Sequence, residues 1–246
     1  MKKFLLASLF AVLFCVNHTM AQDAFDVQSR VYKNALKYYD IQAATVALYN
    51  MIALKPERTD LNDSLTYLYF AGERYGQSYI LGEEILKANP NRLDVLQVVA
   101  VSKQNLGLVK EALADFERLY AAQKDLFYLY QMATLQYQLK RYGECVASLD
   151  MIIADPKSSE EKVSISIQNG SQDVPMRAAA LNVKGICAME LNQPEAAKDN
   201  FSKAIEAFPQ FALARSNIEM LAQKQAEAKS AAAPKPATTT TTAPKK

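Results

Sequence analysis

Residues Ala178–Pro209, AAALNVKGICAMELNQPEAAKDNFSKAIEAFP, predict two short helices that pack against each other. Small residues stand where the two helices would touch, at Gly185 in the first helix and Ala197 in the second. Phe201 supplies a large apolar plug, and Pro209 ends the second helix because proline cannot continue the helical hydrogen-bond ladder. If this unit recurs along the chain, it determines the fold.

The unit recurs at a regular interval. Pro56 and Pro90 are one such interval apart, and Pro156 again ends a predicted second helix. The small residue early in each second helix recurs at the same interval with little variation, and once more after an insertion: Ala44, Ser78, Ala112, Cys145 and Ala197. Apolar plugs follow four of these positions: Leu48, Phe116, Leu149 and Phe201. Repeat two breaks the pattern with Gly82.

This order of small, aromatic and proline positions resembles the tetratricopeptide repeat (TPR), a helix–turn–helix unit with a period of about 34 residues. The chain contains no tryptophan, so the tryptophan of the family pattern is missing from every repeat. The resemblance implies an all-α fold, an α–α superhelix or TPR solenoid over residues 22–229, in which each repeat packs only against its neighbours. Five repeats are expected, at residues 23–56, 57–90, 91–124, 125–156 and 176–209.

The N-terminus has the features of an export signal. A basic start, Lys2-Lys3, precedes the apolar run Phe4–Val16, and Thr19-Met20-Ala21 offers a cleavage site, which predicts a signal peptide over residues 1–21. The run is too short to span a bilayer, which takes about 20 apolar residues. We expect a bacterial protein that is periplasmic or secreted after cleavage at Ala21, with no membrane span. An uncleaved, membrane-associated N-terminus is the alternative.

A second kind of structure is predicted between repeats four and five, at residues 157–175. Val163, Ile165 and Ile167 alternate with serines, and Asn169-Gly170 is a strong hairpin-turn signal, so a small β-hairpin is expected. Its apolar residues either fold back on the neighbouring helices or form an open edge that takes a partner strand.

The C-terminal part divides into a helix and a tail. Residues 210–229 predict one more amphipathic helix, which would cap the open end of the array. Residues 230–246 are almost only Ala, Pro, Thr and Lys, and such a composition predicts a disordered tail because it cannot bury enough apolar surface.

The composition argues against catalysis and nucleic-acid binding. The only histidine, His18, lies in the predicted signal, so the mature chain lacks the commonest general base and metal ligand. The phosphate-binding glycine motifs, the GxSxG nucleophile motif and CxxC are absent. Without the signal, Lys+Arg and Asp+Glu both number 26, and no basic stripe occurs. We expect a non-enzymatic protein with no cofactor, no metal and no nucleic-acid partner; hydrolysis by carboxylates alone is the alternative.

Two cysteines, Cys145 and Cys187, remain after removal of the signal. An even number in an oxidising compartment invites a disulfide. Two buried free thiols that fill small core sites are the favoured alternative, because a disulfide requires Cα atoms within about 7 Å.

A ligand groove follows from the resemblance. In TPR proteins the first helices of successive repeats line a concave surface, and the repeat register places ten residues of this chain there: Lys33, Asp63, Tyr67, Phe70, Gln97, Gln104, Phe127, Tyr130, Tyr137 and Asn182. The Lys/Asn/Arg clamp with which some members hold a C-terminal carboxylate is not present. Aromatic rings beside amides suit an extended peptide, although any one of these tyrosines could instead pack between helices.

These observations predict a protein–protein interaction scaffold in the bacterial cell envelope, whose partner is another envelope protein or peptide. Two alternatives remain open from the sequence. Stacked aromatics with amides would also bind a glycan. The hairpin edge, Val163, Ile165 and Ile167, would allow weak homo-oligomerisation of a purely structural module.

Overall fold

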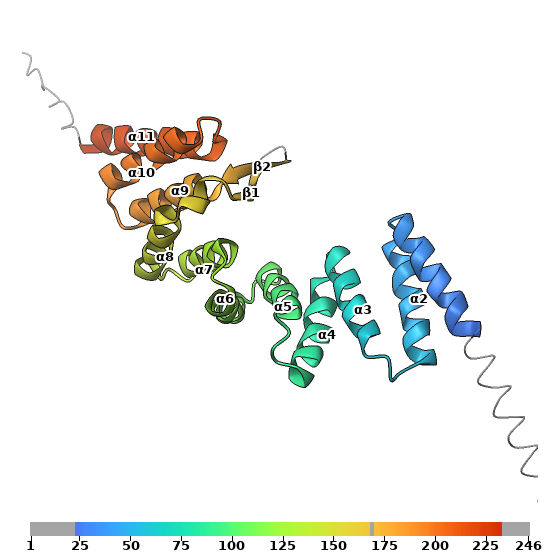
Figure 1. Cartoon of the computed structure of the whole chain (residues 1–246). Coiled ribbons are helices and arrows are strands. Elements are labelled where there is room, and N and C mark those ends of the chain that lie inside the picture. The colour runs from blue at the N-terminus through green and yellow to red at the C-terminus, as the bar shows by residue number, and fades with distance from the viewer. Residues whose placement is uncertain (1–22, 168–169, 233–246) are drawn as a thin grey trace, which may run out of the picture. The chain divides into compact units, whose positions relative to one another are not determined.

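The computed structural model describes residues 23–167 and 170–232 (Figure 1). A helix at residues 23–37 is followed by α2 (Ile41–Leu54), α3 (Asp60–Ala71), α4 (Tyr75–Ala88), α5 (Leu93–Asn105), α6 (Val109–Gln123), α7 (Leu126–Gln138) and α8 (Tyr142–Ala154). After a short 3-10 helix come β1 (Lys162–Ile167), β2 (Gly170–Pro175), α9 (Met176–Glu190), α10 (Pro194–Ala207) and α11 (Ala212–Ala232). The predicted all-α fold with one β-hairpin insertion is confirmed. The predicted signal and most of the predicted tail lie outside the described residues.

The chain divides into two compact units, and the boundary between Tyr128 and Leu129 falls inside α7. In the first unit an apolar core joins the helix at 23–37 to α2 and α3 through buried residues such as Phe25, Leu48 and Leu65. In the second unit Phe201 of α10 is the centre of a core that joins α9 to α11.

The repeat positions chosen from the sequence form the contacts between helices. The small residues of the second helices are fully buried, and so are the four predicted plugs: Ala44, Ser78, Ala112, Cys145 and Ala197, with Leu48, Phe116, Leu149 and Phe201. All nine therefore lie in the core, as small and apolar residues between packed helices should.

Gly82 has a steric reason for replacing the plug of repeat two. A Cβ atom at Gly82 of α4 would lie 2.4 Å from Cγ2 of Val99, a fully buried residue of α5. The neighbouring helix therefore fills the space that a plug side chain occupies elsewhere, and any larger residue at position 82 would clash.

The turns between the paired helices also repeat. One residue in each turn has a positive φ, and these residues follow the period of the repeats, with one longer interval across the insertion: Tyr39, Glu73, Gly107, Lys140 and Asn192. A left-handed residue commonly ends a helix, because its backbone redirects the chain and satisfies the last carbonyl groups. Equal turn geometry therefore repeats the same antiparallel pairing of helices from one repeat to the next.

The base of the hairpin packs against the helices of the second unit, to which the hairpin belongs. Strands β1 and β2 are antiparallel, Val163 lies opposite Val174, and both side chains are buried. The Gln172 amide donates to the Gln210 carbonyl oxygen at 2.7 Å, and Figure 1 shows the strands beside α9. The alternative in which the hairpin folds back on its neighbours is thus confirmed for this end, whereas Ile167 at the far end remains 37% exposed.

The position of the hairpin turn differs from the prediction by one residue. Gly170, predicted as a central turn residue, pairs with Ile167 as the first residue of β2 and has a φ of 134°. The backbone still needs glycine there, because few other residues adopt this φ. Residues 168–169 lie outside the described part of the chain.

Candidate functional site on helices α3 and α5

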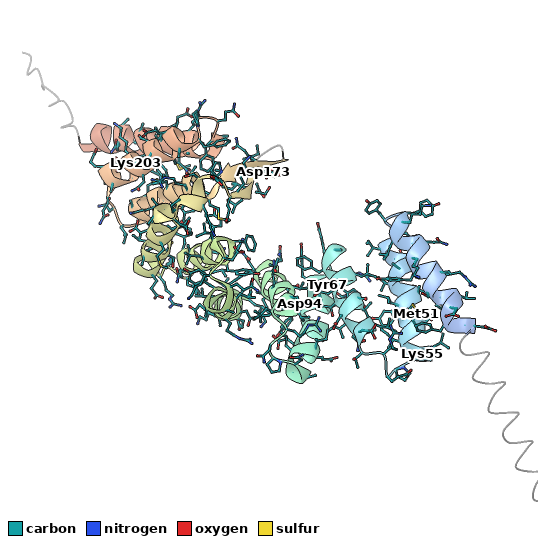
Figure 2. The ribbon with its side chains drawn as sticks, viewed as in Figure 1. Met51, Lys55, Tyr67, Asp94, Asp173 and Lys203 are labelled. Carbon is teal, nitrogen blue, oxygen red and sulfur yellow. The ribbon has the colours of Figure 1, made fainter. Side chains whose placement is uncertain are left out.

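A charged hydrogen-bond network joins α3 to the start of α5 in the first unit. The Tyr67 hydroxyl donates to Asp94 Oδ2 at 2.8 Å, and Figure 2 shows these two residues side by side. The Arg92 guanidinium donates to both oxygens of Asp94 at 2.9 and 2.7 Å, and to Asp63 Oδ2 at 2.8 Å. Two predicted groove residues, Asp63 and Tyr67, are therefore held in place by two residues of the next repeat.

The charges in this network fix its protonation states. The hydrogen bond from Arg92 holds the pKa of Asp94 well below its usual range, and the two aspartates raise the pKa of Arg92. Burial and the hydrogen bond to Asp94 raise the pKa of Tyr67. Counted formally, one guanidinium and two aspartate side chains give the network a net charge of −1. Arg92 is already neutralised by two carboxylates and is a poor receptor for the carboxylate of a ligand.

A separate hydrogen bond, outside this charged network, joins α5 to α7. Gln97 Oε1 accepts from the Tyr128 hydroxyl at 3.1 Å, and the Tyr128 ring meets the edge of Phe127 at a centroid distance of 5.7 Å. The Gln97 amide nitrogen donates to no acceptor within residues 23–167 and 170–232. Gln97 is exposed, so its two N–H groups can serve a ligand.

We call the face formed by these two helices the α3–α5 surface. It consists of Asp63, Tyr67 and Phe70 from α3 and Asp94, Gln97 and Gln104 from α5. The spacings of three, four and seven residues place each set on one side of its helix. Tyr67 is 37% exposed, and Phe70 is half-buried with its ring edge-on to Tyr75 at 6.0 Å. The surface combines aromatic area with hydrogen-bond donors and acceptors.

The other predicted groove residues lie in different surroundings. Lys33 is exposed on the first helix, and Phe127 is half-buried beside Tyr128. In the second unit Tyr137 is half-buried, with its ring 5.9 Å from that of Tyr142.

Two predicted residues are buried inside the second unit instead of lining an open groove. Tyr130 is only 9% exposed, and Asn182 is 2% exposed. Asn182 Oδ1 accepts from the Asn217 amide of α11 at 2.8 Å, so α11 covers this position. The repeat register predicts which helix carries a residue, but it does not reveal that the terminal helix covers Asn182.

Sequence reasoning missed Arg92 and Asp94, although the sequence holds a signal for them. The pattern Arg-x-Asp occurs at Arg58-x-Asp60 and again one repeat later at Arg92-x-Asp94, each at the start of a first helix. In both copies the guanidinium binds the carboxylate through two hydrogen bonds; for Arg58 and Asp60 both are 2.7 Å. A carboxylate in the first helical turn is favoured by the helix dipole.

The second unit contains a hollow of about 630 Å³ between α8, α9 and α10, which carries several charged side chains. Its two lysines are both paired, Lys184 with Asp150 and Lys203 with Asp199. The third cation of the hollow, Arg177, donates to the Ile153 carbonyl oxygen at 2.7 Å.

Burial of Tyr130 predicts a loss of stability in alkali. Burial raises the pKa of its hydroxyl to about 12. An unfolded tyrosine ionises near pH 10, so the folded state retains its proton while the unfolded state loses it. The stability that this group contributes is complete below pH 10 and is lost as the pH rises from 10 to 12. We expect a loss of about 2–3 kcal/mol over this range from this residue.

Urea denaturation at pH 8, 10, 11 and 12 measures this dependence. A Tyr130→Phe variant should match the unchanged chain at pH 8 and lose less stability above pH 10. The prediction is contradicted if both chains lose the same free energy of unfolding between pH 10 and 12.

Comparisons with known proteins find likeness in structure but not in sequence. No protein-family model and no curated protein sequence matches the chain. The structure of YrrB, described as "a TPR protein with an unusual peptide-binding site", matches with a TM-score of 0.60 and 15% identity over 78% of this chain and 88% of YrrB. A MamA structure matches with a TM-score of 0.60 and 10% identity, over 87% and 100% of the two chains. The structure of MamA from Desulfovibrio magneticus RS-1 matches with a TM-score of 0.60 and 14% identity, over 77% of this chain and 98% of that MamA chain. At these identities the likeness is one of fold.

Proposed function

We propose that this chain, which has the fold of the tetratricopeptide repeat proteins, is a non-enzymatic scaffold that binds an extended segment of a partner protein on the α3–α5 surface. The observation that carries the proposal is the state of Tyr67. More than a third of its side chain is open to solvent, while its hydroxyl is held by Asp94. The description of YrrB as a TPR protein with a peptide-binding site supports the same class of ligand.

An exposed ring that is already held in one conformation favours binding, because little further conformational entropy is lost when a ligand binds. Ordering one flexible side chain on binding costs about 0.5–1.5 kcal/mol, and Tyr67 is ordered before a ligand arrives. Gln97 can donate its amide hydrogens to a backbone carbonyl of an extended segment. The net charge of −1 on the network of Asp63, Arg92 and Asp94 favours a neutral or basic segment over one that ends in a carboxylate.

The partner is proposed to be another protein of the cell envelope. The basic start and the apolar run that precede Ala21 support export of the mature chain. Within the described residues, no helix is both long and apolar enough to cross a bilayer. The same residues include no cluster of His, Cys, Asp or Glu that could hold a metal ion.

A double variant, Tyr67→Ala with Gln97→Ala, tests the proposal by affinity capture from the cell envelope. Truncating a central interface tyrosine often costs about 2 kcal/mol or more, so we expect partner affinity to fall by roughly 30-fold or more. Tyr38→Ala is the matched control, because Tyr38 is 73% exposed at the end of the first helix and lies outside the surface. It should capture the partner as well as the unchanged chain does.

The comparison requires that both variants unfold at the temperature of the unchanged chain. Equal capture by all three chains would reject the α3–α5 surface as the binding site. Capture of glycan without protein would replace a protein ligand by a carbohydrate. Capture of nothing but the chain itself would indicate a self-associating module.

A further inference from the structure

The two cysteines of the second unit meet in its core. Cys145 lies on α8 and Cys187 on α9, both side chains are fully buried, and both thiols are free. Their sulfur atoms are 3.5 Å apart, although 42 residues separate them in the sequence. A disulfide bond is about 2.05 Å long, so the two sulfurs would close by roughly 1.5 Å to form one.

The repeat register shows which residues occupy the equivalent two positions in other repeats. Cys145 and Cys187 occupy one pair of positions, on a second helix and on the following first helix. The same positions earlier in the chain hold Ala44 with Leu68, and Ser78 with Ser102. All four of these residues are buried, and Ala44 and Leu68 belong to one core cluster, so an alanine and a leucine suffice to fill these positions. Packing alone therefore does not require two cysteines here.

We propose that Cys145 and Cys187 form an intramolecular disulfide when the chain folds under oxidising conditions. The bond would join α8 to α9 and close a loop that contains the whole β-hairpin insertion. It would fix the junction from which the hairpin projects. The inference is independent of the α3–α5 surface, which lies in the other unit, but its operation in the cell rests on the proposed export, since disulfides persist in oxidising compartments.

The reaction needs a disulfide-bearing oxidant, such as oxidised glutathione or a thiol–disulfide oxidoreductase. The thiolate of one cysteine attacks the oxidant and releases one of its sulfurs as a thiol, which leaves a mixed disulfide. The second cysteine, after losing its proton, attacks the cysteine sulfur of that mixed disulfide and releases the other half of the oxidant as a second thiol. Two protons and two electrons pass from the cysteines to the oxidant. Because both thiols are buried once α8 and α9 have docked, the exchange takes place during folding or local opening.

Oxidative refolding of the full chain tests the proposal. A Cys15→Ser substitution leaves Cys145 and Cys187 as the only thiols. After refolding with oxidised and reduced glutathione, we expect a monomer with no thiol that can be alkylated in denaturant, and a digest that contains the Cys145–Cys187 linked peptides. Closing a loop of this length typically makes the unfolding constant roughly 30- to 700-fold smaller. A phosphine reductant should reverse this change.

The matched control replaces the pair with the residues at the same positions in repeats one and two, Ala44 and Leu68, as Cys145→Ala with Cys187→Leu in the same Cys15→Ser background. Its stability should not respond to the reductant. Two free thiols per chain after oxidative refolding would overturn the proposal, as would disulfides found only between chains. An equal response of the control to the reductant would also overturn it, because the change could not then come from this bond.

Discussion

An Asp115→Ala substitution is expected to lower the free energy of unfolding of the first unit by about 3–5 kcal/mol, because it removes one partner from a buried ion pair. The Lys103 ammonium lies 2.6 Å from Asp115 Oδ2 and 2.7 Å from Glu83 Oε1. Lys103 and Asp115 are only 7% and 6% exposed. Burial alone would lower the pKa of Lys103, but the hydrogen bonds to Asp115 and Glu83 outweigh it and raise the pKa.

The loss of Asp115 would leave the Lys103 charge in the core with Glu83 as its remaining anion. A double variant, Lys103→Met with Asp115→Leu, removes the two most buried charges and keeps most of the volume, while Glu83, whose side chain is 33% exposed, can be hydrated instead. Such replacements are often neutral or stabilising, so the double variant should recover most of the lost stability. Urea denaturation of the full chain measures both changes.

An exposed pair provides the control for this experiment. Lys203 and Asp199 form an ion pair on the surface of α10, with side chains that are 55% and 58% exposed. An Asp199→Ala variant should lose no more than about 1 kcal/mol, since exposed pairs contribute little. An Asp115→Ala variant as stable as this control would contradict the assignment of a buried, coupled pair.

The fold was predictable from the sequence because the repeat pattern records where helices touch. Ala112 and Cys145 were chosen only for their spacing and small size, and both are fully buried. The pattern also predicted the hairpin, because a period of two stands out against helical spacing. The pattern predicted Gly170 as a central turn residue, whereas Gly170 is the first paired residue of β2. Strand pairing, and not the Asn-Gly dipeptide alone, decides which residues form the turn.

The candidate site was only partly predictable, for a physical reason. The register assigns Tyr67 and Gln97 to the first helices of their repeats, and both lie on the α3–α5 surface. It says nothing about hydrogen bonds between repeats, so the role of Asp94 as the partner of Tyr67 was not foreseen. Nor does it show which face a terminal helix covers, and α11 buries Asn182 through Asn217.

The helix pair α9–α10, from which the fold was predicted, also provides the second large effect. Phe201 of α10 is fully buried against α9, and a Cβ atom at Gly185 would lie 2.5 Å from its Cε1 atom. A Phe201→Ala variant should lose about 3–5 kcal/mol of unfolding free energy, through lost burial and the cavity that remains. A Gly185→Ala variant should lose about 1–3 kcal/mol, because the new methyl group collides with the ring.

The two positions should be coupled, and a double-mutant cycle measures the coupling. In the double variant Phe201→Leu with Gly185→Ala, leucine is smaller than the phenylalanine ring. It therefore leaves part of the space that the new alanine methyl group needs. The double variant should therefore lose less stability than the Phe201→Leu and Gly185→Ala single variants together, by about 0.5–3 kcal/mol. Gly143→Ala serves as the glycine control, because a Cβ atom there meets nothing within 4 Å. It should leave stability unchanged or raise it slightly, since alanine favours the helix. If Gly185→Ala is as well tolerated as Gly143→Ala, or if the cycle is additive, the close approach of α9 to Phe201 is not what requires glycine at position 185.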